Sequence, residues 1–372
     1  MNTFVVEQKF LSSILSFTQP IVSKKTAISS TSYILFQINT HELVIKATDL
    51  EISLQFSCPL KESTIEHLQV LVPGKKVFDI VKELDGDIEC ALEDNQLLIK
   101  CGKVHVALNI KSADEFPPLP ERIENLMQID AKFLLELFSK VSFLIPQNNS
   151  SPALNGLFIE ISAQELKMTT TDGHCLAQVK TNRYTLNQDK RWLVPRRGIF
   201  EIKKILENTE GNTVFLGVCG NQLVFSGESF NFFTKLLADE FPAYHMILNK
   251  ETFIPARVPK NDFIKTLRRS SCLLSGQFLA TTFKFAGNNV KVSLKNSDIG
   301  KLEETLLLHD FDSEPLEMRF YSPYLLNGLQ SFQQDDVQFY LKNNNRPIIF
   351  EANNQNMYEM VYLVMPVSSA NV

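Results

Sequence analysis

Apolar positions along the chain follow two spacings, and segments of the two kinds alternate in a fixed order. Apolar residues at every second position predict a strand, whereas apolar residues three and four positions apart predict a helix. The first part of the chain gives a strand, a helix and then three strands, at Thr3–Glu7, Gln8–Phe17, Ser32–Ile38, Glu42–Ala47 and Glu51–Cys58. We call this order of strand, helix and three strands one half-unit of the fold.

The half-unit recurs along the chain, and the pattern predicts six copies. Five further helices with one apolar face are expected at residues 74–84, 131–143, 195–207, 260–274 and 323–332. A helix with a single apolar face has to pack against another element, so the half-units are expected to pair. The sequence therefore predicts an α+β protein of three similar domains, each with two helices and about eight strands.

Short motifs that occur twice support this duplication. Three pairs recur at offsets of 122 to 125 residues: Thr48-Asp49 with Thr171-Asp172, Leu71-Val-Pro73 with Leu193-Val-Pro195, and Phe116-Pro117 with Phe241-Pro242. Three landmarks at nearly one offset indicate a duplicated domain. Because proline-rich linkers are typical of domain boundaries, the segments 117–122 and 243–250 predict domains at residues 1–122, 126–246 and 250–372.

The composition is typical of a soluble intracellular protein. The chain has 372 residues, enough for two or three domains with their own cores, and a formal charge of −5 at pH 7. Its six cysteines are scattered without a C-x-x-C pair, which favours reduced thiols over disulfides or a zinc site. No apolar run reaches membrane-spanning length and the N-terminus does not read as a signal peptide, so a cytoplasmic protein is expected.

Catalytic chemistry would have to start at the turn that carries Asp172, His174 and Cys175. A Cys–His nucleophile pair needs side chains that face each other, whereas neighbouring residues at a strand start point to opposite faces. The corresponding turns near Leu50 and Asp298 have no histidine, and no phosphate loop or metal motif is present. We therefore expect no catalytic residue, metal or cofactor. An enzyme acting on DNA or nucleotides through this turn remains the alternative.

Basic residues concentrate on the predicted helices although the whole chain is acidic. One solvated basic helix face is common, but equivalent helices that share one predict a surface that binds phosphates without sequence specificity. No aromatic residues are interleaved with these cations, which argues against single-strand binding. The expected DNA-binding residues are Lys24, Lys25, Lys75, Lys76, Arg196, Arg197, Lys203, Lys204, Lys265, Arg268 and Arg269.

Six stretches, in this order and spacing, resemble the bacterial sliding clamp family, the beta subunit of DNA polymerase III. They are Ala47-Thr-Asp-Leu-Glu51, Leu154-Asn-Gly156, Thr170-Thr-Asp-Gly-His174, Val194-Pro-Arg-Arg-Gly198, Phe241-Pro-Ala-Tyr244 and Tyr362-Leu-Val-Met-Pro366. The resemblance implies the DNA-clamp fold and a head-to-tail homodimer that closes into a six-domain ring around duplex DNA. It also implies a non-catalytic processivity factor that tethers polymerases and repair proteins and is opened by a clamp loader. A diverged clamp that serves accessory polymerases is the second alternative.

The resemblance implies a peptide-binding groove between the second and third domains. The matching positions are Leu154, Thr171, Gly173, His174, Cys175, Leu176, Pro242, Met246, Ile247, Pro347, Leu363, Val364, Met365 and Pro366. Cys175 and Met246 depart from the family, because many members have arginine there. We therefore expect partner peptides to bind mainly through apolar anchors. The tail after Pro366 is also longer than usual.

The implied ring also needs an interface between domains one and three. Apolar residues are expected at its centre and charged residues at its rim. The expected interface residues are Lys75, Lys76, Lys103, Val106, Leu273, Leu274, Phe278, Asp298, Glu303 and Glu304.

Overall fold

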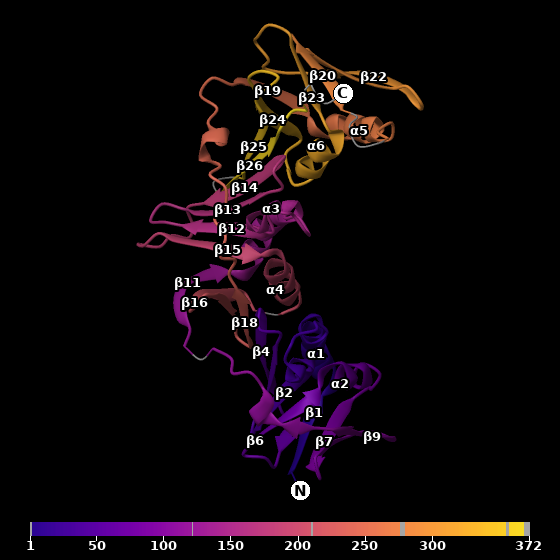
Figure 1. Ribbon diagram of the computed structural model, residues 1–372, viewed down its shortest axis with the longest axis vertical. Coiled ribbons are helices and arrows are strands. Elements are labelled where there is room, and N and C mark those ends of the chain that lie inside the picture. Colours follow the sequence, from indigo (N-terminus) through magenta and orange to yellow (C-terminus); the bar gives the residue numbers. More distant parts are fainter. Residues whose placement is uncertain (1, 121, 210, 276–279, 355–356, 368–372) are drawn as a thin grey trace. The chain divides into compact units, whose positions relative to one another are not determined.

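The computed structural model contains the predicted half-unit six times (Figure 1). It describes the chain except residues 1, 121, 210, 276–279, 355–356 and 368–372. The first two half-units are β1 (Asn2–Glu7), α1 (Gln8–Val22), β2 (Tyr33–Asn39), β3 (Glu42–Thr48) and β4 (Ile52–Pro59), then β6 (His67–Pro73), α2 (Gly74–Val81), β7 (Asp87–Glu93), β8 (Gln96–Cys101) and β9 (Val104–Asn109). Two short strands, β5 (Glu62–Ser63) and β10 (Lys111–Ser112), accompany them.

The remaining four half-units repeat the same order. The middle pair is β11 (Glu124–Asp130), α3 (Ala131–Val141), β12 (Gly156–Ile161), β13 (Leu166–Thr171) and β14 (Cys175–Thr181), then β15 (Lys190–Pro195), α4 (Arg196–Asn208), β16 (Thr213–Cys219), β17 (Gln222–Ser226) and β18 (Phe230–Lys235). The last pair is β19 (Ile254–Pro259), α5 (Lys260–Ser271), β20 (Thr281–Ala286), β21 (Asn289–Asn296) and β22 (Gly300–Leu307), then β23 (Leu316–Phe320), α6 (Ser322–Leu329), β24 (Asp336–Leu341), β25 (Ile348–Asn354) and β26 (Tyr358–Val364). The α+β class and the repeated half-unit are confirmed.

The chain packs into two compact units. The N-terminal unit comprises Met1–Leu135 with Arg197–Leu236, and the C-terminal unit comprises Glu136–Arg196 with Leu237–Val372. These units group residues by packing, so the predicted domain limits at 122–126 and 246–250 stay a prediction.

Two antiparallel sheets form the N-terminal unit. A five-stranded sheet has the order β5-β1-β7-β8-β9, and a nine-stranded sheet has the order β10-β6-β2-β3-β4-β18-β17-β16-β11. The second sheet is continuous because β4 pairs with β18, with Phe56 opposite Phe230 and Leu54 opposite Phe232. Helices α1 and α2 pack against each other, and α1 also contacts β3 and β4. We call the β4–β18 pairing the first junction.

The C-terminal unit repeats this plan. An eight-stranded sheet has the order β15-β12-β13-β14-β26-β25-β24-β19, and a four-stranded sheet has the order β22-β21-β20-β23. Here the pairing of β14 with β26 joins the strands of two half-unit pairs, with Leu176 opposite Leu363. Helices α5 and α6 pack against each other. A Cβ atom on Gly328 of α6 would lie 1.9 Å from the ring of Tyr362, so this helix approaches β26 closely only with glycine there. We call the β14–β26 pairing the second junction.

Helix ends differ from the sequence prediction in a regular way. Three predicted helices, 74–84, 260–274 and 323–332, run three residues too long, because each final turn tightens into i→i+3 hydrogen bonds. Just after α5, for example, the N–H groups of Leu273 and Leu274 donate to the carbonyls of Ser270 and Ser271. Helix α1 is longer than predicted, because Ile21 and Val22 continue its buried face.

No helix in the described ranges is long and apolar enough to cross a membrane. All six cysteines are free, and four of them are buried.

Candidate binding sites

The turn between β13 and β14 is built around one aspartate. Asp172 Oδ1 accepts hydrogen bonds from the backbone N–H groups of His174 (2.8 Å) and Cys175 (2.7 Å). The Thr171 hydroxyl donates to the Cys175 carbonyl at 2.6 Å and accepts from the Gly173 N–H at 3.1 Å. Gly173 has φ +93°, a conformation that costs glycine little and other residues more. These bonds fix the turn and leave His174 exposed.

The equivalent turn between β3 and β4 has the same hydrogen bonds. Asp49 Oδ1 accepts from the N–H groups of Glu51 (3.0 Å) and Ile52 (2.8 Å), and Thr48 Oγ1 accepts from the Leu50 N–H at 3.1 Å. Leu50 takes the place of Gly173 with φ +75°. The two Thr-Asp motifs therefore form the same turn twice within this chain, and the duplication inferred from the sequence is present in the folded structure.

The turn does not form a nucleophile pair. Cys175 is 1% exposed, whereas His174 is exposed and its ring lies 5.7 Å from the ring of Tyr324. Burial, with a smaller contribution from Asp172, raises the pKa of the Cys175 thiol well above its usual range. A thiol of this kind is a poor nucleophile near neutral pH. Among the described residues, no group of three or more His, Cys, Asp or Glu side chains is placed to hold a metal ion.

A hydrophobic cluster covers one face of the second junction. Its buried members are Leu176, Tyr244, Ile349 and Leu363. Half-buried side chains pack against them: Phe158, Phe241, Ile247, Leu248, Phe253, Tyr340, Val361 and Met365. The cluster brings together β12, β14, β24, β25, β26 and the segment 241–253. It therefore joins four of the residues predicted for a peptide groove, Leu176, Ile247, Leu363 and Met365. We call this set the junction cluster.

The linker after β18 is held on the cluster by aromatic contacts. The rings of Phe158 and Phe241 stack at 4.8 Å, and Phe241 meets Tyr244 edge to face at 6.0 Å. The Tyr244 hydroxyl donates to Glu160. Burial, with the hydrogen bond to Glu160, raises the pKa of Tyr244 far above its usual range, so the phenol is neutral. These contacts stabilise the cluster without a bound partner.

The other predicted groove residues lie around the cluster or behind it. Cys175 and Val364 are strand partners next to Leu176 and Leu363, and neighbours along a strand point to opposite faces. They therefore face away from the junction cluster. Thr171, Gly173 and His174 belong to the turn, which is tied to the C-terminal segment because the Met365 N–H donates to the His174 carbonyl at 2.9 Å. Leu154 and Pro347 are buried, Pro366 is half-buried and Pro242 is exposed.

Met246 is 89% exposed on the short helix His245–Leu248, beside Ile247 of the cluster. Phe158, Tyr244, Tyr340 and Ile349 were not predicted for the groove, although Tyr244 ends one of the family-like stretches. The alternation of apolar residues in the strands of Phe158, Tyr340 and Ile349 signals burial, but it does not show that separate strands converge on one face.

Arg197 at the start of α4 is engaged within the N-terminal unit. Its guanidinium makes an ion pair with Asp49, which is 3% exposed, and donates to the Pro20 carbonyl at 2.7 Å. It thereby ties α4 to the β3–β4 turn and to α1. In the C-terminal unit, Arg196 donates to the Ile145 carbonyl. Both arginines were predicted to face DNA, and both hold elements of the fold together.

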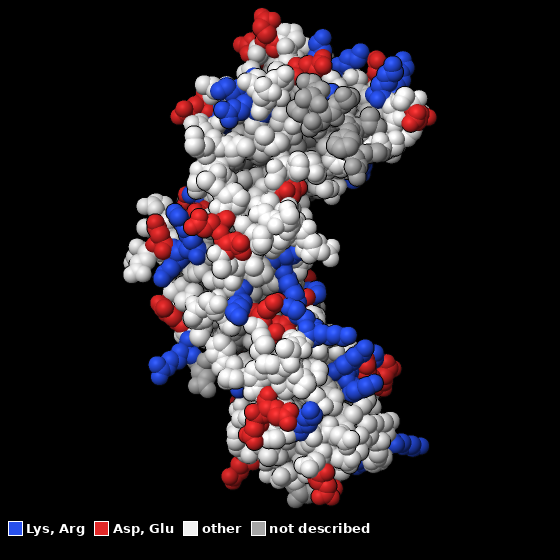
Figure 2. Space-filling model, viewed as in Figure 1, with Lys and Arg blue, Asp and Glu red and all other residues white. Residues whose placement is uncertain are grey.

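Some of the other cations predicted to bind DNA form ion pairs within the chain, and others are exposed outside these pairs. Lys24 pairs with Glu51, Lys204 with Glu201, Lys265 with Asp262 and Arg269 with Glu304, whereas Lys203 lies over the Phe200 ring. Burial lowers the pKa of Lys203. Lys25, Lys75, Lys76 and Arg268 are exposed, and none of the ion pairs found among the described residues includes them. Figure 2 shows Lys and Arg side chains over the helices of the N-terminal unit.

Each unit has several edge strands among the described residues, and one of them carries residues predicted for the interface. In the N-terminal unit this strand is β9, where Val104 is 46% exposed and Val106 is half-buried. In the C-terminal unit it is β22, where Leu307 is 52% exposed. Of the predicted interface residues, Lys75, Lys76, Lys103, Asp298 and Glu303 are exposed, and Leu273, Leu274 and Glu304 are half-buried. Phe278 lies outside the described residues.

Comparison with known proteins gives one family over the whole chain. Sequence models of the DNA polymerase III beta subunit match in order: the N-terminal domain at residues 1–120, the central domain at 128–243 and the C-terminal domain at 247–368. The chain is 26% identical to the beta sliding clamp of Pseudomonas putida, covering 98% of this chain and 99% of that protein. It is 24% identical to the beta sliding clamp of Staphylococcus epidermidis, covering 99% of both.

Solved structures show the same fold. A DNA polymerase sliding clamp from Pseudomonas aeruginosa, determined with a ligand, superposes with a TM-score of 0.90 at 24% identity over 99% of this chain and 100% of that one. A DNA polymerase III beta subunit from Thermotoga maritima gives a TM-score of 0.87 at 22% identity over 99% of this chain and 100% of that one. With the repeated half-units and the shared Thr-Asp turns, these matches show that the chain belongs to the DNA polymerase III beta subunit family, the sliding clamps.

Proposed function

We propose that this sliding clamp works as a closed ring of two copies that encircles duplex DNA and tethers a polymerase. The observation that supports the ring is that two unlike edge strands, β9 in one unit and β22 in the other, carry residues predicted for the interface. An unpaired edge is a template for another strand, and natural proteins rarely leave one exposed. Because the two edges differ, a contact between them is head to tail, and two such contacts close a ring of two copies.

Side chains along the two edges support this pairing. Val104 and Leu307 expose apolar surface that a partner strand would cover. Lys75, Lys76 and Lys103 lie exposed in the N-terminal unit, and Asp298 and Glu303 lie exposed in the C-terminal unit, so the charges are complementary in sign. Leu273 and Leu274 follow α5 and are half-buried. We assign the apolar residues to the affinity of the contact and the charges to its register.

The interface is tested by sedimentation velocity over a range of concentrations. Leu273→Ala combined with Leu274→Ala removes two apolar side chains just after α5, a helix that contacts β22, so we expect folded monomers where the unaltered chain is a dimer. Lys103→Ala serves as the matched control, because an exposed rim charge contributes little and the dimer should persist. A dimer that survives in the double variant at low concentration would show that the interface lies elsewhere.

For DNA, we propose that the exposed cations Lys25, Lys75, Lys76, Lys265 and Arg268 contact phosphates. Contacts of this kind carry no sequence information and weaken steeply with salt, which suits a ring that slides. Arg197 has a structural role in this proposal, since its partners are Asp49 and Pro20.

For partners, we propose that a linear peptide from a polymerase, clamp loader or repair protein binds the junction cluster. Ile247 and Met365 are half-buried and lie over the buried Leu176 and Leu363, so an apolar anchor can replace water there. Met246 places an exposed thioether beside them, which favours apolar contacts over ionic ones. We propose that the chain does this without catalysis, in the cytoplasm where it meets DNA. An enzyme at the Asp172–Cys175 turn is not favoured, because the Cys175 thiol is buried.

A further inference from the structure

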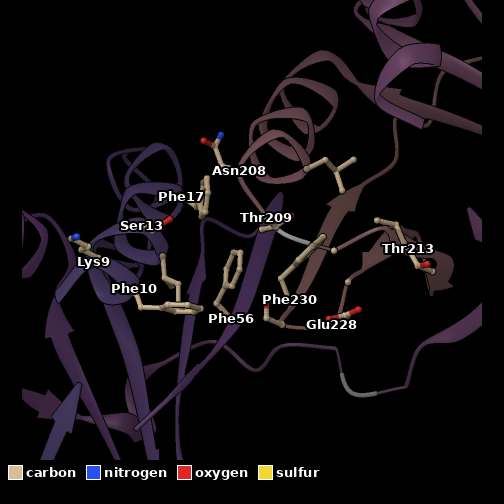
Figure 3. Close-up of a pocket in the computed structure, with 16 residues that line it drawn as sticks. Lys9, Phe10, Ser13, Phe17, Phe56, Asn208, Thr209, Thr213, Glu228 and Phe230 are labelled. Atoms are coloured by element: carbon tan, nitrogen blue, oxygen red, sulfur yellow. The ribbon is translucent and has the colours of Figure 1, made fainter. Parts of the chain in front are cut away.

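A cavity of about 380 Å³ lies in the N-terminal unit beside the first junction (Figure 3). Side chains reach it from α1, β4, the end of α4 with the loop to β16, and the turn between β17 and β18. Its floor is buried and apolar, formed by Ile14, Phe56, Leu206, Val214 and Phe230. This cavity is separate from the junction cluster and shares no residue with it.

Aromatic rings form one wall of the cavity. Phe17 stacks on Phe56 with ring centres 5.5 Å apart, and Phe56 lies 5.6 Å from Phe230, so three rings follow one another from α1 through β4 to β18 (Figure 3). Phe10 stands beside them and is 49% exposed. This wall could not be predicted from the sequence, because its rings come from separate elements and converge only in the folded chain.

Polar groups surround the aromatic wall. Ser13 of α1 and Asn208 at the end of α4 are exposed at the cavity, and Lys9 and Glu228 place charges of opposite sign at its edge (Figure 3). An apolar floor with a few polar groups is the usual composition of a binding pocket.

Because the fold repeats, the residues around this cavity have counterparts at the second junction. Helix α1 begins after Glu7 and α3 begins after Asp130, so Ser13 and Phe17 correspond to Glu136 and Lys140. Phe56 pairs with Phe230 at the first junction, and Val179 pairs with Met360 at the second. Two residues before Phe230 and Met360, Glu228 in the β17–β18 turn therefore corresponds to Tyr358 of β26.

At the second junction the chain fills this position with its own tyrosine. The Tyr358 hydroxyl donates to Glu136 Oε1 at 2.9 Å. The Lys140 ammonium lies 5.7 Å from the centre of the Tyr358 ring and donates to the Ser331 carbonyl at 2.9 Å. All four residues belong to the C-terminal unit. Burial and the bond to Glu136 raise the pKa of Tyr358 to about 12, so the hydroxyl is a donor at neutral pH.

We propose that the cavity at the first junction is a docking point for a partner protein that inserts a tyrosine side chain, as Tyr358 does at the second junction. The ring would pack on Phe17 and cover Phe10, and its hydroxyl would meet Ser13 or Asn208 in place of Glu136. Lys9 and Glu228 would pair with charged residues on either side of the inserted tyrosine. This docking point is independent of the junction cluster, so a partner could hold the clamp at two places.

The direct test titrates the full-length chain against a capped Gly-Tyr-Gly tripeptide that carries 3-fluorotyrosine, observed by 19F NMR. A single side chain buries few atoms, so we expect a saturable dissociation constant in the millimolar range. A capped Gly-Leu-Gly tripeptide should compete at least about tenfold less well, because it lacks the ring and the hydroxyl. Equal competition by the leucine peptide, or no saturable binding, would overturn the proposal. Binding of free p-cresol combined with no binding of the tyrosine tripeptide would also overturn it, because the cavity would then accept a small molecule but not a tyrosine carried by a peptide chain.

Two variants that fill the cavity from different walls locate the binding. Ser13→Trp and Glu228→Tyr should each weaken tripeptide binding by at least about tenfold, with unfolding temperature and dimer unchanged. Glu228→Tyr recreates the arrangement of the second junction, so it also tests the repeat argument. Leu176→Ala with Met365→Ala should bind the tripeptide as the unaltered chain does. Loss of binding only in that last variant would place the tyrosine at the junction cluster and refute the second docking point, while leaving the proposed ring and peptide site untouched.

Discussion

At the scale of single residues, the chain repeats a turn and changes one position in it. Asp49 and Asp172 accept the same pair of backbone hydrogen bonds, and the residue that follows each has positive φ. Glycine occupies that position in one copy and leucine in the other. A non-glycine residue in the left-handed region costs roughly 1–2 kcal/mol. Leu50 is 40% exposed, so packing offsets only part of this cost.

Exchanging the residue types at this position should change stability in opposite directions. Gly173→Ala should lower the free energy of unfolding by about 1 kcal/mol, because its Cβ meets no close neighbour and only backbone strain is added. Leu50→Gly should raise the free energy of unfolding by up to about 1 kcal/mol, because glycine adopts positive φ without strain. Leu50→Ala keeps the backbone strain, so it should not raise the free energy of unfolding. Urea unfolding monitored by circular dichroism measures both. If Leu50→Gly is no more stable than Leu50→Ala, the turn is not strained.

The cysteines give a second test at this scale. Burial raises the pKa of Cys58, with a smaller contribution from Glu7, and that of Cys90, both to about 12. Their thiolate fraction at pH 8 is therefore on the order of one in ten thousand. Only Cys272 is exposed.

We expect a thiol reagent to label the native chain at pH 8 with one fast phase, which Cys272→Ser removes and Cys58→Ser leaves in place. Raising the pH should speed the fast phase long before the buried thiols react. Several fast-reacting thiols in the native protein would contradict the burial of Cys58 and Cys90.

At the scale of elements, periodicity predicted the order of helices and strands, because burial on one face dictates spacing. It placed several helix ends three residues too late, since the final turns keep apolar residues but change their hydrogen bonds. The family resemblance, rather than periodicity, predicted Leu176, Ile247, Leu363 and Met365, which the structure gathers into one cluster. Periodicity cannot predict contacts between segments that are distant in the sequence. Arg197 and Asp49 are 148 positions apart, and nothing local reveals that they pair.

The junction cluster gives the prediction at this scale. Leu176→Ala combined with Met365→Ala shortens two of its side chains on different elements and leaves the backbone in place. Losing two apolar contacts should raise the dissociation constant of a labelled polymerase-derived peptide by at least about tenfold, as measured by fluorescence anisotropy. Binding should also depend weakly on ionic strength, because Met246 is apolar.

Met246→Arg tests the predicted weak dependence of peptide binding on ionic strength. It should strengthen binding of acidic peptides at low salt and lose that gain as salt rises. Unchanged affinity in the double variant, with the dimer intact, would place the peptide elsewhere.

At the scale of the whole molecule, six similar half-units build four sheets, and β9 and β22 are two unlike edge strands among them. The sequence predicted the repeat, since each copy carries its own periodicity. It did not predict which strands would be left unpaired, because pairing depends on where the half-units meet. A closed ring would pair both edges, and it would hold DNA by topology instead of by affinity. Weak, salt-sensitive contacts from Lys25, Lys75 and Arg268 would then be sufficient.

The most direct test of the ring is retention on DNA of different topology. The chain is loaded with its clamp loader onto nicked circular DNA, and complexes are separated by gel filtration at high salt. We predict that the protein stays with circular DNA and is lost after a restriction enzyme linearises the same circle, because a ring slides off free ends. Release at the same rate from circular and linear DNA would contradict the account, because binding would then depend on contacts alone.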